Sequence, residues 1–169
     1  MLRKLQCLKA KRGFTLVELI VVIAIIGVLA AILIPVLSGV IESARMRSVE
    51  STCHSIENLA KAYATHYMAR VGGNYDGSDT VDMEDGAGPV TMKEYIQKQI
   101  PEIMPGSNRG AKVVVIGGLV DQVIYTEGSF TASWNVDNNA IFSEKNAYYA
   151  VSGGVIDIGT TRVSLPSPT

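Results

Sequence analysis

The sequence predicts an α+β protein in which one long N-terminal helix packs on an antiparallel β-sheet. Three patterns lead to this prediction. No charged residue occurs from Leu19 to Ile41, and a helix of that length spans roughly 34 Å, enough to cross a bilayer. Apolar residues then recur at spacings of three and four, as in an amphipathic helix. After residue 111, short alternating segments separated by turn residues are typical of strands.

We expect a continuous helix from near Phe14 to about Arg70, ending at the Gly72-Gly73 pair. Its first half is apolar on all sides, so it must be buried in lipid or among other helices. Its second half presents one apolar stripe to a core, and that core requires a partner surface from the C-terminal region. The stripe consists of Met46, Val49, Cys53, Ile56, Ala60, Tyr63 and Tyr67.

The segment between the two glycines Gly72 and Gly88 is predicted to be a solvated loop because it is rich in Gly, Asp and Ser. Its clustered carboxylates leave calcium binding open as an alternative, because calcium takes oxygen ligands. Their spacing does not match an EF-hand loop, and we prefer the solvated loop. These carboxylates belong to Asp76, Asp79, Asp82, Glu84 and Asp85.

A short helix is expected to follow, with Thr91 and Glu94 forming a capping box and Pro101 ending it. Its apolar positions, which we expect to pack over the sheet edge, are Met92, Tyr95, Ile96 and Ile100.

Six strands are predicted downstream, and their short connections predict antiparallel hairpins. Around Trp134 the alternation places Phe130, Ala132, Trp134 and Val136 on one face, which we expect to pack on the helix stripe, and Thr131, Ser133 and Asn135 on the other. The tail 165–169 is expected to be exposed or disordered. The strands are Lys112–Ile116, Leu119–Thr126, Phe130–Val136, Ala140–Phe142, Ala147–Val151 and Val155–Ile158.

Charge is distributed unevenly along the chain. Five of the 15 basic residues lie in the first 13, which predicts that this leader stays in the cytoplasm while the rest is exported. Without the leader, 10 basic and 16 acidic side chains remain, a formal net charge of −6. The acidic balance argues against bulk attraction to nucleic acid, although a local basic patch stays possible.

Glu18 is anomalous because an ionisable group at the start of an apolar run costs about 3 kcal/mol or more unless it is paired. Cleavage between Gly13 and Phe14 would create an α-amino group four residues before Glu18, one helical turn away and opposite in charge. Processing of the chain would therefore supply the cation that the sequence lacks.

These residues, Lys11-Arg12-Gly13 followed by Phe14-Thr15-Leu16-Val17-Glu18 and a long apolar helix, closely resemble the class III signal of type IV pilins and related pseudopilins. The resemblance covers residues 11 to about 40. It implies cleavage by a prepilin peptidase after Gly13, methylation of the new N-terminus at Phe14, and pairing of Glu18 with the N-terminus of a neighbouring subunit during assembly. The implied domains are a cytoplasmic leader 1–13, a transmembrane or assembly half 14–41 and a globular pilin head 42–169.

The N-terminus has two other interpretations. A secretory signal peptide also has basic residues before an apolar core, and Ala30-Ala31 resembles a small-residue cleavage site. However, the apolar run continues past Ala31 and begins beside a glutamate. A plain signal anchor of a lone ectodomain explains length and orientation but leaves Glu18 unpaired.

Gly27 and Pro35 weaken the apolar half of the helix, since glycine lacks side-chain support and proline lacks a backbone donor. In filaments of similar pilins the segment between such residues loses helicity on assembly. We carry this to 27–35 as a hypothesis, with a mild kink as the alternative.

The resemblance implies a structural subunit of a type IV pilus that serves adhesion, motility or DNA uptake. Its implied partners are further copies of the chain in a helical filament, the prepilin peptidase, the pilus assembly platform and minor pilins. The precursor would cross the cytoplasmic membrane once, N-in/C-out, and the assembled subunit would be extracellular. A minor pilin that binds a ligand as an adhesin, and a type II secretion pseudopilin, are the alternatives.

No catalytic set is found, and neither a cofactor nor a metal is predicted. His54 and His66 are twelve residues apart on the predicted helix, about 18 Å along its axis, and cannot share one metal within a subunit. Cys53 lies on the apolar stripe and is expected to be a buried, inert thiol. Because Cys7 leaves with the leader, the C-terminal disulfide of many pilins is not carried over to this chain.

Overall fold

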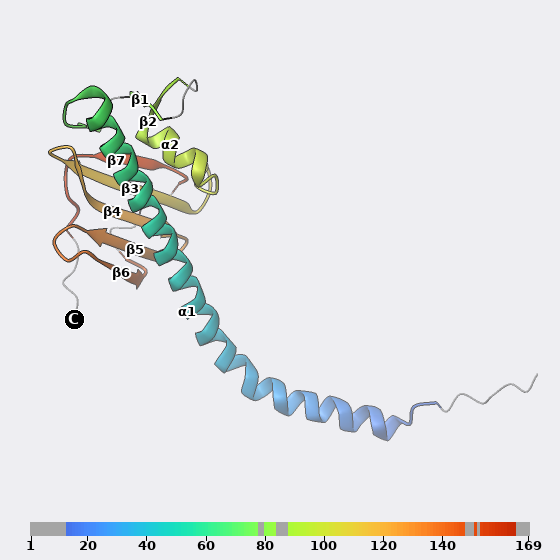
Figure 1. The fold of residues 1–169 in the computed structure, drawn as a ribbon. Coiled ribbons are helices and arrows are strands. Elements are labelled where there is room, and N and C mark those ends of the chain that lie inside the picture. The colour runs from blue at the N-terminus through green and yellow to red at the C-terminus, as the bar shows by residue number, and fades with distance from the viewer. Residues whose placement is uncertain (1–12, 78–79, 84–87, 148–150, 152, 165–169) are drawn as a thin grey trace, which may run out of the picture. The chain divides into compact units, whose positions relative to one another are not determined.

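The fold was analysed in a computed structural model that describes residues 13–77, 80–83, 88–147, 151 and 153–164 (Figure 1). Two helices and seven strands are present among the described residues, and the α+β prediction is confirmed. The chain divides into two units, Met1–Ile41 and Glu42–Thr169. The elements are α1 Leu16–Val71, β1 Thr80–Asp82, β2 Pro89–Thr91, α2 Met92–Gln99, β3 Arg109–Ile116, β4 Leu119–Glu127, β5 Phe130–Asn135, β6 Ala140–Lys145 and β7 Ile156–Gly159.

Helix α1 begins and ends within two residues of its predicted bounds. At its C-terminus, Gly72 adopts a φ of 76° and its N–H donates to the carbonyl of Met68 at 3.0 Å. A left-handed conformation of this kind favours glycine, because a Cβ atom is strained there. The first of the two glycines therefore terminates the helix.

The stripe of α1 forms the core of the globular unit together with one face of the sheet. Six of its seven predicted members are buried, and Met46 packs against them while partly exposed. Ile56 and Trp134 are among the largest fully buried side chains. Figure 1 shows this part of α1 crossing the face of the five-stranded sheet. The predicted contact between stripe and sheet is confirmed for Phe130, Ala132 and Trp134. It is wrong for Val136, which follows the end of β5 and is 49% exposed.

The main sheet has the strand order β6-β5-β4-β3-β7. Neighbouring strands are antiparallel from β3 to β6, as predicted, and a bulge interrupts the register between Val114 and Val115. Strand β7 corrects the prediction, because it pairs parallel with β3, with Ala111 opposite Ile156. The predicted strand Ala147–Val151 is not found at Ala147 or Val151, and residues 148–150 lie outside the described part of the chain.

Part of the predicted acidic loop is a strand. Thr80–Asp82 forms β1 and pairs with β2, which leads directly into α2. The capping box of α2 is confirmed, since Thr91 and Glu94 make both reciprocal hydrogen bonds. The Glu94 carboxylate accepts a hydrogen bond from the Thr91 backbone N–H at 2.8 Å. This bond, followed by the one from the Thr91 hydroxyl, lowers the pKa of Glu94. Asp79, Glu84 and Asp85 lie outside the described residues.

The second face of the sheet is also covered, which the sequence analysis did not anticipate. Thr126, Thr131 and Ser133 are buried there. Ile124 and Ala147 form a second apolar cluster with Val151 and Val163 of the C-terminal segment. The polar side chains of this face find partners within the protein, such as the 3.1 Å hydrogen bond between the hydroxyls of Thr126 and Thr131.

Hydrogen bonds at two residues, Arg162 and Val163, fix the C-terminal segment on this face. The guanidinium of Arg162 donates to Asp121 at 2.6 Å and to Asp137 at 2.5 Å. Gln122 and Val163 exchange two hydrogen bonds of 2.9 Å between the side-chain amide and the backbone. The bonds to Asp121 and then Asp137 raise the pKa of Arg162. We call this set, Arg162, Asp121, Asp137, Gln122 and Val163, the C-terminal clasp. The predicted tail 165–169 lies outside the described residues.

Candidate assembly site

The site begins at the first turn of α1, where Thr15 is the residue before the helix. The Thr15 hydroxyl accepts a hydrogen bond from the Glu18 backbone N–H at 3.2 Å. In return, Oε2 of Glu18 accepts from the Thr15 N–H at 2.9 Å and from the Thr15 hydroxyl at 2.8 Å. This reciprocal arrangement is a capping box, which satisfies backbone donors that a helix start leaves without partners.

The capping box refines the interpretation of Glu18. Its carboxylate already has hydrogen-bond donors in its own chain, so its polar needs are partly met before any cleavage. Thr15 is uncharged, however, and does not neutralise the carboxylate. The sequence analysis missed this pairing, although the spacing of Thr15 and Glu18 is the same as that of Thr91 and Glu94.

The residues at the predicted cleavage site are accessible. Phe14 is 84% exposed, and a Cβ atom built on Gly13 would meet nothing within 4 Å. Neither residue belongs to a helix or strand. Cleavage after Gly13 and methylation of Phe14 remain predictions.

The rest of the first unit is an exposed apolar helix. Its large apolar side chains from Leu16 to Ile41 are between 45% and 73% exposed. Among the described residues, α1 is the one helix that is long and apolar enough to cross a membrane. Burying such a surface is strongly favourable, at about 25 cal/mol per Å² of apolar area. The helix therefore needs a lipid or protein environment.

Gly27 and Pro35 do not interrupt the helix in the isolated subunit, since α1 is continuous through both. The space beside Gly27 is open, and one turn after Pro35 the Ser38 hydroxyl donates to its carbonyl at 2.8 Å. The hypothesis that 27–35 loses helicity concerns the filament and remains a prediction.

The histidines and the cysteine lie in the globular unit and do not form a site. His54 contacts Glu57 at 2.9 Å, whereas His66 contacts the carbonyl of Asp82 at 2.9 Å. No group of three metal-ligating side chains occurs among the residues that the structure describes.

Cys53 is fully buried, as predicted, and burial, followed by the nearby Glu57 carboxylate, raises the pKa of its thiol to about 12. Such a thiol stays protonated and unreactive at neutral pH.

The N-terminal segment matches the family model described as the prokaryotic N-terminal methylation motif over residues 8–34. The chain carries the N-terminal motif of the type IV pilin and pseudopilin family. The match includes Gly13, Phe14, Glu18 and Gly27, and Pro35 follows immediately after it. The predicted resemblance to this family is thereby confirmed for the N-terminal segment.

The chain is also similar to the type II secretion system core protein G of Escherichia coli (strain K12). It is 45% identical to this chain over 53 residues, which are 31% of this chain and 37% of that protein. The alignment thus spans little more than a third of the curated relative's length. No solved structure matches the chain.

Proposed function

We propose that this chain is a structural subunit of a type IV pilus. A prepilin peptidase cuts the precursor after Gly13 and methylates Phe14, and the assembly platform then adds the subunit to a helical filament. The observation that carries the proposal is the exposed apolar half of α1 with a single carboxylate, Glu18, at its start. This surface requires burial, and the carboxylate requires a cation.

In the filament, apolar half-helices of neighbouring copies bury one another, which supplies the driving force. The α-amino group of Phe14 from one copy pairs with Glu18 of another, and this pairing directs the assembly of the subunits. Within the apolar surroundings of the filament, this ion pair is stronger than in water because the local dielectric constant is lower. Before assembly, the same half-helix holds the precursor in the cytoplasmic membrane, N-in/C-out, and afterwards the subunit is extracellular.

A type II secretion pseudopilus is the second candidate, favoured by the similarity to core protein G over 53 residues. Both candidates use the same N-terminal chemistry, so they differ in the machine that the subunit serves. Neither candidate requires enzymatic activity.

Deleting the gene and restoring it with wild type or Glu18→Ala tests the proposal. A pilus subunit predicts that surface filaments, sheared and weighed against total protein, disappear on deletion, return with wild type and do not return with Glu18→Ala. A pseudopilus subunit predicts instead that exported proteins are retained while surface filaments persist. Full restoration of filaments by Glu18→Ala would contradict the pairing mechanism.

A further inference from the structure

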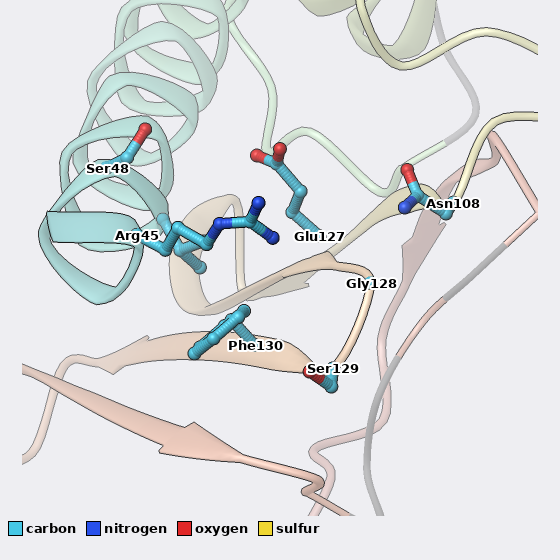
Figure 2. Close-up of a pocket in the computed structure, with 8 residues that line it drawn as sticks. Arg45, Ser48, Asn108, Glu127, Gly128, Ser129 and Phe130 are labelled. Atoms are coloured by element: carbon cyan, nitrogen blue, oxygen red, sulfur yellow. The ribbon is translucent and has the colours of Figure 1, made fainter. Parts of the chain in front are cut away.

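A cavity of about 280 Å³ lies in the globular unit between α1 and the turn that joins β4 to β5. Figure 2 shows Arg45 reaching from α1 toward this turn, with Phe130 below its guanidinium and Glu127 and Asn108 beyond it. The lining is mostly polar. It consists of Arg45, Ser48, Val49, Asn108, Glu127, Gly128, Ser129 and Phe130.

The charges around this cavity leave one cation without a counter-ion. Glu127 is engaged by Arg109, whose guanidinium donates to it at 3.0 Å. The Arg45 side chain makes neither a hydrogen bond nor an ion pair with any residue that the structure describes. The set of Arg45, Arg109 and Glu127 therefore has a formal charge of +1, in a head whose overall balance is acidic.

The cavity lining also supplies hydrogen-bond donors. Ser48 and Ser129 bring hydroxyls and Asn108 brings an amide to the lining, and the side chains of all three lack hydrogen-bond partners within the described ranges. An arginine fork with neighbouring hydroxyl and amide donors is suited to an anion with several acceptor oxygens. Phosphate is such an anion, and arginine binds it through short, charge-assisted hydrogen bonds.

We propose that this cavity binds a phosphate group, with Arg45 as its charged ligand. Arg45 follows Ile41, the last residue of the apolar run, by four positions on the same helix. Four residues correspond to about 6 Å, and the headgroup layer on each side of the hydrocarbon is roughly 5–8 Å thick. A phospholipid headgroup is therefore the favoured source of the phosphate, and free phosphate is the other. The lipid source rests on the membrane-spanning helix proposed above, whereas the phosphate chemistry does not.

The test uses the full chain in neutral detergent micelles and two probes, short-chain phosphatidylglycerol and inorganic phosphate, with binding measured by titration and native mass spectrometry. Arg45→Gln is compared with Arg47→Gln, which removes the same charge two residues away from a side chain that does not line the cavity. We expect Arg45→Gln to weaken binding about tenfold, as for loss of a charge-assisted hydrogen bond. We expect Arg47→Gln to change binding less than about twofold, as for a diffuse surface charge.

Each outcome decides the proposal. Arg45-dependent binding of the lipid alone supports a headgroup site, and Arg45-dependent binding of both probes supports a general phosphate site. Equal losses in the two variants would show diffuse charge attraction and overturn the proposal, as would failure of the wild type to bind either probe. Circular dichroism verifies that both variants are folded. Filament formation is not part of the readout, so the result is independent of the assembly mechanism.

Discussion

Thr15 and Glu18 form a capping box in which Oε2 of the carboxylate accepts both hydrogen bonds from Thr15, at 2.9 Å and 2.8 Å. Glu18 thus has two possible roles at the start of α1. It caps its own helix, and it presents a negative charge to a neighbouring subunit. Substitutions at this one position can separate the two roles.

Glu18→Gln is the informative variant, because its amide oxygen can still accept from Thr15 while its charge is lost. If charge pairing directs assembly, both Glu18→Gln and Glu18→Ala insert in the membrane but yield few or no filaments. Membrane fractionation measures insertion, and quantitative blotting of sheared material measures assembly. Filament yields near wild type for Glu18→Gln, with a loss for Glu18→Ala only, would assign the residue to capping.

The buried stripe of α1 accounts for the stability of the globular unit. Ile56 is fully buried on this stripe, so we expect Ile56→Ala to lower the free energy of unfolding by about 2–5 kcal/mol through lost burial and a residual cavity. Asn58→Ala, on the exposed side of the same helix, should stay within about 0.5 kcal/mol of wild type. Urea unfolding followed by the fluorescence of Trp134 measures both. Equal effects would contradict the orientation of the helix.

Cys53 predicts a pH dependence whose sign follows from its raised pKa. The folded thiol ionises only at about pH 12, whereas an unfolded thiol ionises near 8.5. Below the unfolded value both states hold the proton, so the group has no effect. As pH rises above it, the unfolded state alone loses a proton, and stability falls.

This linkage can be checked with a thiol-reactive dye. At pH 9 the folded protein should not react at Cys53, whereas urea-unfolded protein should react fully. Cys53→Ala should show a weaker loss of stability between pH 8 and 10 than wild type. Rapid labelling of the folded state would show that the thiol is accessible.

The C-terminal clasp predicts that Arg162 holds the last described segment on the sheet. Arg162→Ala should lower the melting temperature and increase amide hydrogen exchange at residues 160–164 and at the buried polar face near Thr126. Arg47→Ala is the matched control, since its side chain has no ion pair within the part of the chain that is described. Because Arg162 is partly exposed, high salt should reduce the difference between the two variants. Unchanged exchange in Arg162→Ala would rule out the clasp.

Local patterns made the helices and most strand pairings predictable from the sequence. The stripe from Met46 to Tyr67 and the capping box at Thr91 depend on residues three or four positions apart, and the antiparallel hairpins depend on short turns. The parallel pairing of β7 with β3 could not be derived, because it joins residues 45 positions apart, as Lys112 and Asp157 show. The cover over the second face of the sheet could not be derived for the same reason, since the C-terminal clasp is also formed by residues distant in sequence. The capping box of Thr15 and Glu18 is local as well, because it has the same three-residue spacing as that of Thr91 and Glu94.

The most direct test of the central claim is the mass of the mature N-terminus in material sheared from the cell surface. The account predicts an abundant filament subunit that begins at methylated Phe14, with nothing before it. Intact-mass and N-terminal peptide mass spectrometry give this result in one experiment. A chain that stays in the membrane with residues before Phe14 still attached would contradict the account and support a plain membrane-anchored ectodomain.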